Sequence, residues 1–278
     1  MKSTSLQDVT FSTCSYIKDT SSVRAKMVKS VLKSWAELLQ LPFAEKIFLD
    51  DQSPNSAALS VLDACAMREK FSRVVYHDIK HPPHSNFGIV ASMRLATTPL
   101  ILHLDDDVFA TETADECRSF IELAARLMGD DPSILGCNML TVDKHIHGVE
   151  WQPGETYDRF PAWSHPQKYF GTGACLVRRE LLQRVTFEQL MSWGAAQPAT
   201  WEQLVTNSPA EFLTGPLKTP FGSRDSAFLY SATANASLRE CLNHESRLAI
   251  GRTKEAVKRI LPAPLLAIYR GIRGKKLE

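Results

Sequence analysis

The sequence predicts an α/β fold in which helices flank a mostly parallel β-sheet. From Val9 onward, short runs rich in β-branched and aromatic residues alternate with helix-length amphipathic stretches. Such alternation is typical of parallel strands joined by crossover helices. Polar residues directly follow two of the runs, at 50–55 and 105–107, and the carboxyl ends of strands are where open α/β sheets bind ligands.

The expected strands are short and apolar, and they lie at 9–15, 46–50, 73–76, 100–104 and 134–141. Apolar residues at helical spacing predict helices within 23–39 and 113–128. After residue 142 the rhythm becomes irregular, with a strand expected at 169–177, a helix at 178–185 and a further helix that begins at 223–225. The sequence therefore predicts one domain over 1–250, which is regular up to about residue 142, and a separate tail at 251–278.

Composition excludes several classes of protein. The chain has 278 residues, 32 Lys+Arg against 31 Asp+Glu, and a formal charge of +1, which rules out a disordered acidic chain and a globally basic nucleic-acid-binding protein. The six cysteines form no CxxC pair, so neither a zinc ribbon nor a disulfide framework is expected. The sequence has no apolar run of about 18 residues and no signal-peptide pattern at its start. We therefore expect a cytoplasmic protein.

The tail is the one strongly charged segment. Residues 251–278 contain eight basic and two acidic residues, interleaved with apolar ones. A basic, apolar segment of this kind is expected to contact the inner face of an anionic membrane peripherally. The alternative is that its apolar residues pack on the domain, because Pro262 and Pro264 interrupt any long amphipathic helix.

Three consecutive aspartates, Asp105, Asp106 and Asp107, follow the apolar run 100–104. Carboxylates this close repel one another, and full hydration or a divalent cation relieves the repulsion. Mn²⁺ or Mg²⁺ held by one or two carboxylates and by substrate phosphates is the usual arrangement. A solvated acidic loop before a helix is the alternative interpretation.

Several segments together carry a resemblance to a known family. They are the hydroxyl-rich first strand, Asp-Asp-Gln-Ser at 50–53, Thr-Pro-Leu-Ile-Leu-His-Leu-Asp-Asp-Asp-Val at 98–108, the Gly-Thr-Gly segment at 171–182 and Gly-Ser-Arg-Asp at 222–225. In this order they resemble GT-A glycosyltransferases, and 98–108 looks most like exostosin-like and family 2 enzymes. The resemblance covers about residues 8 to 235. It implies a donor-nucleotide half at 8–110 and an acceptor half at 111–250.

The resemblance also implies roles for residues of the donor half. Thr13 and Asp51 would contact the base of a nucleotide sugar, with the Asp51 carboxylate accepting the uracil N3–H. Asp105 would bind ribose, and Asp106 or Asp107 would bind the metal ion that bridges the diphosphate. The triplet allows both registers, so the choice between Asp106 and Asp107 stays open.

Four further positions match the family less closely. Asn86 and Arg94 lie where family 2 enzymes carry an Arg-Asn pair, which is missing here, and Arg94 would replace it in contacting phosphate. Asp225 matches the carboxylate that faces the acceptor, as the general base of an inverting enzyme or as a positioning group in a retaining one; a helix N-cap is its structural alternative. His244 matches a third metal ligand, although a lone histidine is more often a surface or core residue.

Two other groups of residues bear on a possible metal site and on the acceptor site. The pairs His81/His84 and His145/His147 have no evident third ligand, so we expect no metal site at either. Aromatic residues gather in the irregular segment, where their rings are suited to stack on an acceptor sugar: Trp151, Tyr157, Trp163 and Tyr169.

The sequence thus predicts a metal-dependent glycosyltransferase of polysaccharide biosynthesis. It would move a sugar from a nucleoside-diphosphate donor, expected to be UDP-linked, to a hydroxyl of a glycan or lipid-linked acceptor. The alternative from another class is a non-catalytic sugar-binding or scaffold protein with the same fold. A haloacid-dehalogenase-like phosphatase is disfavoured, because Phe109 stands where Thr or Val is expected four residues after Asp105.

Overall fold

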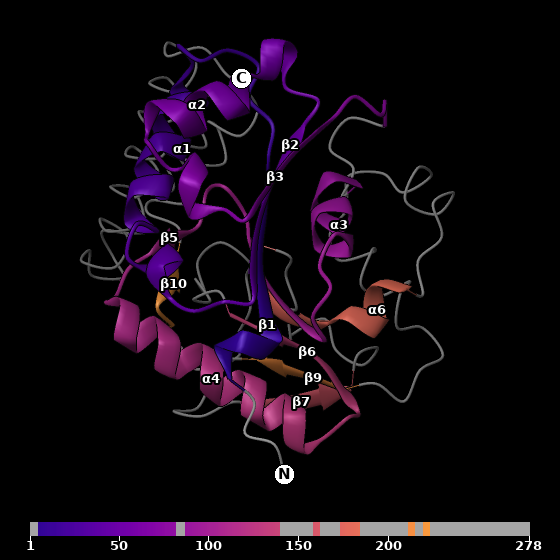
Figure 1. Cartoon of the computed structure of the whole chain (residues 1–278). Helices are drawn as coiled ribbons and strands as arrows, with labels where there is room; N and C mark the ends of the chain where they lie inside the picture. The colour runs from indigo at the N-terminus through magenta and orange to yellow at the C-terminus, as the bar shows by residue number, and fades with distance from the viewer. Residues whose placement is uncertain are drawn as a thin grey trace, which may run out of the picture.

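The computed structural model describes residues 5–81, 87–139, 158–161, 173–183, 211–214 and 219–222. Within them lies an eight-stranded sheet of order β3-β2-β1-β4-β8-β6-β9-β7, with helices on both faces (Figure 1). The four strands of the first half, all parallel, are β1 (Val9–Ser15), β2 (Glu45–Asp51), β3 (Arg73–His77) and β4 (Leu100–Leu104). The strand bounds predicted for β1 and β4 are confirmed, and β2 and β3 are slightly longer than predicted.

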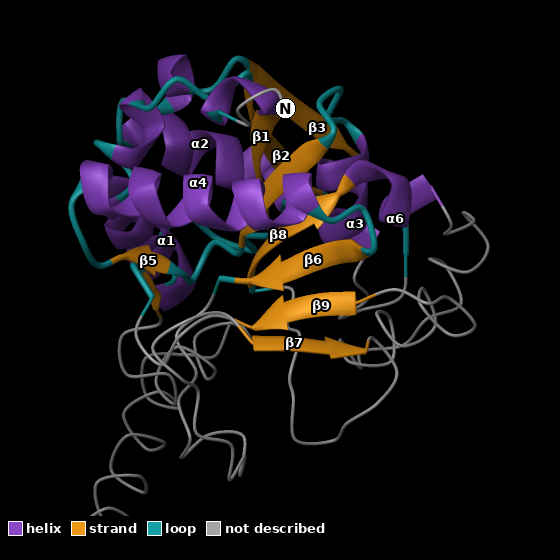
Figure 2. Cartoon of the chain, turned by 90° about the horizontal axis from the view of Figure 1, so that it is seen from below, coloured by secondary structure: helices purple, strands orange, loops and turns teal. Residues whose placement is uncertain are grey.

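The other strands make the sheet mixed rather than wholly parallel. They are β6 (Ile134–Asn138), β7 (Asp158–Pro161), β8 (Ala174–Arg178) and β9 (Glu211–Thr214). Strand β8 runs antiparallel to both β4 and β6, while β9 is parallel to β6 and antiparallel to β7. Figure 2 shows these strands following one another along the sheet. A separate antiparallel pair joins β5 (Phe109–Ala110) to β10 (Phe221–Gly222).

Two sets of helices cover the sheet (Figure 1). On one face, called the α1 face here, lie α1 (Val23–Ser34), α2 (Ala57–Ala64) and α4 (Ala114–Asp130). On the other, the α3 face, lie α3 (Phe87–Arg94) and α6 (Arg179–Gln183). Four 3₁₀ turns complete the described elements: Leu6–Asp8, Leu38–Gln40, Pro54–Ser56 and Arg68–Lys70. None of the helices among the described residues has the length and apolarity that crossing a bilayer requires.

Side-chain caps explain where the two longest helices begin. Ser22 accepts a hydrogen bond from the amide of Ala25 at the start of α1. Thr113 and Glu116 form a capping box at the start of α4. Helix α1 ends at Ser34, before the predicted limit at 39, and the remaining apolar residues of that stripe continue into the 3₁₀ turn at Leu38–Gln40.

The strands supply two separate cores because successive side chains point to opposite faces. Phe11, Phe48 and Leu102 belong to the buried cluster on the α1 face. Ile47 and Ile101 belong to the cluster on the α3 face. The same alternation continues to the strand ends, and there it decides which face each polar side chain occupies.

Trp35 connects the core to the segment that follows β4. Its ring is fully buried and meets Phe11 edge-on, with centroids 5.4 Å apart. Its Nε1–H donates to the carbonyl oxygen of Val108 at 2.9 Å. Val108 directly follows the three aspartates, so this hydrogen bond fixes the backbone beside them.

We expect Trp35→Phe to lower the free energy of unfolding by about 1–3 kcal/mol, because it removes the donor from a buried carbonyl. Urea unfolding followed by circular dichroism measures the change. Tyr76→Phe is the control, since Tyr76 is 46% exposed and its substitution should leave the midpoint unchanged. Equal midpoints for the wild-type and Trp35→Phe proteins would contradict the role of the hydrogen bond.

Candidate active site

The carboxyl ends of the adjacent parallel strands β1, β2 and β4 meet at one edge of the sheet. Ser15 ends β1, Asp51 ends β2, and the three aspartates follow β4. Five of the residues for which the sequence predicted a site role therefore lie at or near this edge: Thr13, Asp51, Asp105, Asp106 and Asp107.

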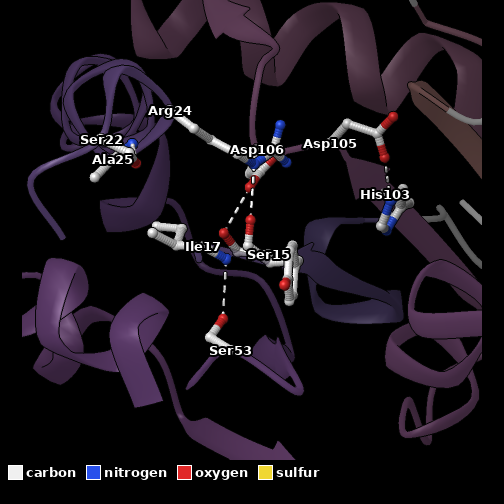
Figure 3. A network of polar contacts seen from close by, with 10 residues as sticks. Ser15, Ile17, Ser22, Arg24, Ala25, Ser53, His103, Asp105 and Asp106 are labelled. Atoms are coloured by element: carbon white, nitrogen blue, oxygen red, sulfur yellow. Dashed lines mark hydrogen bonds and ion pairs between the residues drawn. The ribbon is translucent and has the colours of Figure 1, made fainter. Parts of the chain in front are cut away.

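Asp106 has a partner on each carboxylate oxygen. Arg24, in the first turn of α1, donates from Nη2 to Oδ1 at 2.6 Å, and Ser15 donates from Oγ to Oδ2 at 2.5 Å (Figure 3). The side chain is 6% exposed. Burial raises the pKa of Asp106, while Arg24 and Ser15 act against that rise. Asp106 is thus held on the α1 face with both oxygens in use.

Among the described residues, Asp105 has one side-chain partner, which lies on the α3 face. Its Oδ1 lies 3.0 Å from Nε2 of His103, a fully buried side chain of β4. Because a carboxylate only accepts, Nε2 donates, and Nδ1 of His103 has no partner among the described residues. The backbone amide of Asp105 donates to the carbonyl of Gly173 at 2.7 Å, which ties it to the residue before β8. One carboxylate oxygen of Asp105 therefore remains for a ligand.

Asp107 differs from both neighbours. No side chain of the described part of the chain bonds to its carboxylate. Burial, followed by the charges of Asp105 and Asp106, raises its pKa to about 7, and the Arg24 charge acts in the opposite direction. Of the three aspartates, Asp107 is therefore the one whose negative charge a bound cation would stabilise most.

The donor set fits a hard divalent cation. One or two carboxylates with substrate phosphates suffice for Mg²⁺, and carboxylate oxygens also suit Mn²⁺. The described residues contain no group of three histidine, cysteine or acidic side chains arranged around a metal ion. Ligand oxygens would therefore have to complete the coordination.

Asp51 lies at the end of β2 and is enclosed by histidines. Its Oδ1 is 2.8 Å from Nε2 of His81 and 3.0 Å from Nε2 of His77. A Cβ at Gly88 would clash with this carboxylate and with Sγ of Cys14, so only glycine permits the approach of α3. Neither histidine could be connected with Asp51 from the sequence alone. Pairing of β2 with β3 was the missing signal, since it puts His77 opposite Asp51.

The structure does not bring Thr13 and Asp51 together. In β1, Ser12 bonds to Ser92 of α3 and Cys14 lies beside Gly88, so Thr13 points to the opposite, α1 face. Its hydroxyl is buried with no partner among the described residues. The expected joint contact of Thr13 and Asp51 with one base is not supported by this arrangement.

Arg94 connects two helices. Its Nε and Nη2 donate to the carbonyl of Leu182 at 3.2 and 2.7 Å, which links α3 to α6. This contact gives Arg94 a structural role, and its contact with phosphate stays a sequence prediction.

Other predicted residues lie outside the described residues. They are Asn86, Asp225, His244, the aromatic residues Trp151, Tyr157, Trp163 and Tyr169, and the basic tail at 251–278. Their roles, and the membrane contact of the tail, stay sequence predictions.

Solved structures are similar to this chain over most of its length. A mannosyltransferase from Pyrobaculum calidifontis, PcManGT, in complex with GDP-Man and Mn²⁺, matches with a TM-score of 0.52 at 14% identity, over 98% of this chain and 81% of that one. S. aureus TarS 1–349 in complex with UDP matches with a TM-score of 0.53 at 14% identity, over 85% and 64%. A longer TarS structure matches with a TM-score of 0.52 at 15% identity, over 81% and 38%. This chain thus spans less than two thirds of both TarS chains.

These likenesses establish the class of fold. The chain has the GT-A glycosyltransferase fold, with a mostly parallel sheet flanked by helices, as the resemblance in the sequence implied. No protein-family profile and no curated protein sequence matches the chain.

We expect Asp107→Asn to raise the melting temperature of the metal-free protein, and to do so more at pH 8 than at pH 5. The raised pKa of Asp107 means that the folded chain holds this proton more tightly than the unfolded chain. The wild-type protein therefore loses stability as pH rises from about 4, the ordinary carboxyl value, to about 7. The asparagine variant does not share that loss.

Thermal unfolding in the presence of a chelator measures this difference. Asp63→Asn is the control, because Asp63 forms only an exposed ion pair with Arg68. An equal change in melting temperature at both pH values would contradict the electrostatic explanation for Asp107.

Proposed function

We propose that this chain is a glycosyltransferase that moves a sugar from a nucleoside-diphosphate donor to an acceptor hydroxyl. One observation carries the proposal. At the edge where β1, β2 and β4 end, Arg24 and Ser15 hold Asp106 in place, while no side chain of the described residues bonds to Asp107 or to the second oxygen of Asp105. A structural acidic loop does not need a partly buried carboxylate to which no side chain of the described residues bonds, whereas a site for a cation and a diphosphate does.

The contacts favour one of the two metal registers. Both oxygens of Asp106 are used by Arg24 and Ser15, so we assign the metal-binding role to Asp107. The free oxygen of Asp105 is assigned to the ribose, with His103 fixing the orientation of its carboxylate. His244 stays a candidate for a further ligand. When bound, Mn²⁺ or Mg²⁺ would neutralise the charge that develops on the leaving diphosphate.

The donor is proposed to be UDP-linked, with Asp51 accepting the N–H of the base. The similar structures contain UDP in one case and GDP-Man in the other, and uracil and guanine both present a ring N–H beside a carbonyl oxygen. The proposed acceptor is a hydroxyl of a glycan or of a lipid-linked glycan. A non-catalytic protein of the same fold would bind the donor without releasing nucleoside diphosphate.

The metal role predicts that Mn²⁺ and UDP bind synergistically. Calorimetry should show UDP binding weakened about tenfold or more without metal, a coupling of about 1.4 kcal/mol. Asp107→Ala should remove the coupling, and Asp63→Ala, far along the sequence and exposed, should retain it. Titrations with GDP, run in parallel, decide the base. UDP and GDP affinities that do not depend on metal would refute the metal role.

The acceptor role of Asp225 is tested by Asp225→Asn. Asparagine keeps the size and most of the capping ability of aspartate. If Asp225 is the general base, transfer should fall by about 10²- to 10⁴-fold while donor affinity and melting temperature stay unchanged. Near-normal transfer by the variant would remove Asp225 from the mechanism and would favour a capping role.

A further inference from the structure

One nitrogen of the Arg24 guanidinium has no hydrogen-bond partner among the described residues. The side chain begins in the first turn of α1 and is 11% exposed. Its Nε donates to the carbonyl of Tyr16 at 2.8 Å and its Nη2 to Oδ1 of Asp106 at 2.6 Å. Nη1 is sealed from bulk water and has no hydrogen-bond partner in the described part of the chain.

An unpaired buried donor of a charged group is costly. Leaving such a group without a partner costs free energy, and the cost is larger when the group carries charge. The other two nitrogens of the guanidinium are fixed, so Nη1 cannot turn toward another acceptor without breaking the contact with Asp106 or Tyr16. A group that arrives with a ligand is therefore the expected partner, and it must be an acceptor.

The charges of the site indicate which acceptor. Three carboxylates and one guanidinium leave two formal negative charges, which one divalent cation neutralises. Asp107 directly follows Asp106 in the chain, and Oδ1 of Asp106 accepts from Nη2 of Arg24 at 2.6 Å. A ligand that binds a cation on Asp107 would therefore also lie near Nη1. Phosphate oxygens satisfy both, because they bind hard cations and pair with guanidinium groups.

We propose that Nη1 of Arg24 binds the diphosphate of the nucleotide donor while Nη2 stays on Asp106. This role rests on the proposed function. Arg24 would then join the fixed aspartate of the triplet to the leaving group, and Figure 3 shows the side chain reaching from α1 to that aspartate. The competing interpretation is that Arg24 is only the counter-ion of Asp106.

A charge-matched double substitution separates these interpretations. Arg24→Gln with Asp106→Asn removes one positive and one negative charge, so the formal charge of the site is unchanged. Replacing both members of a buried ion pair is often nearly neutral for stability. Arg24→Lys is the second variant; it keeps the charge beside Asp106 but loses the second amino group of the guanidinium. The control is the same double substitution in an exposed pair, Arg68→Gln with Asp63→Asn.

Three quantities are measured on the full chain: Mn²⁺ binding alone by electron paramagnetic resonance, UDP and GDP binding in saturating Mn²⁺ by calorimetry, and the melting temperature. In the buried double variant we expect Mn²⁺ affinity within about twofold of wild type and nucleoside-diphosphate affinity lower by about tenfold or more. Arg24→Lys should also bind the nucleotide more weakly, by about threefold or more. The exposed double variant should match the wild type in all three measurements.

Unchanged nucleotide affinity in both Arg24 variants would overturn this role and leave the proposed function intact. Parallel losses of Mn²⁺ affinity, nucleotide affinity and melting temperature would also overturn it, since a structural counter-ion produces that pattern. Failure of the wild-type protein to bind UDP or GDP with Mn²⁺ would instead overturn the proposed function, and this role with it.

Discussion

The ion pair between Arg24 and Asp106 is the interaction on which the three-aspartate segment depends. It joins two segments that are 82 residues apart, and both side chains are largely buried. Without it, three carboxylates would end a buried strand with no cation among the described residues to offset them. With this ion pair and the hydrogen bond from Ser15, the carboxylate of Asp106 is fixed in place. Among the described residues, no side chain bonds to Asp107 or to the second carboxylate oxygen of Asp105.

The backbone around the segment is fixed at both ends, so the carboxylates cannot move apart to relieve their repulsion. The amide of Asp105 is bonded to Gly173, and the carbonyl of Val108 is bonded to the buried ring of Trp35. Burial is the main cause of the raised pKa of Asp107, and the charges of the two neighbouring aspartates, held close by this backbone, add to it. A binding site for a cation is commonly built in this way, at the expense of stability in its absence.

The sequence predicted strands β1 to β4 and helices α1 and α4 well, and it predicted side-chain partners poorly. Strands β1 and β4 were predictable because short apolar runs between polar segments are a local signal. The antiparallel direction of β8 was not predictable, because it depends on pairing with distant strands. Arg24 carried no signal either, since an arginine in the first turn of a helix is ordinary and its partner lies far along the chain.

Thr13 is a second example of a side-chain contact that the sequence does not predict. The sequence correctly placed it in the first strand, but its face depends on the alternation that Ser12 and Cys14 reveal only once α3 is positioned. A prediction of strand position therefore does not extend to a prediction of contact. The register of β2 against β3, which puts His77 opposite Asp51, is hidden from the sequence for the same reason.

The topology explains why the predicted donor site lies at the carboxyl ends of β1, β2 and β4. The order β3-β2-β1-β4 means that the chain leaves β1 toward β2 on one side and later returns to place β4 on the other. At such a switch point the connections that follow adjacent strands diverge and leave a crevice outside the strand ends. The hydrogen bond from Ser15 to Asp106 joins the end of β1 to the segment that follows β4. Arg24 reaches the same point from α1, because that helix follows β1 directly. A cation on Asp107 and a diphosphate on Arg24 would thus both lie where the fold itself leaves room for a ligand.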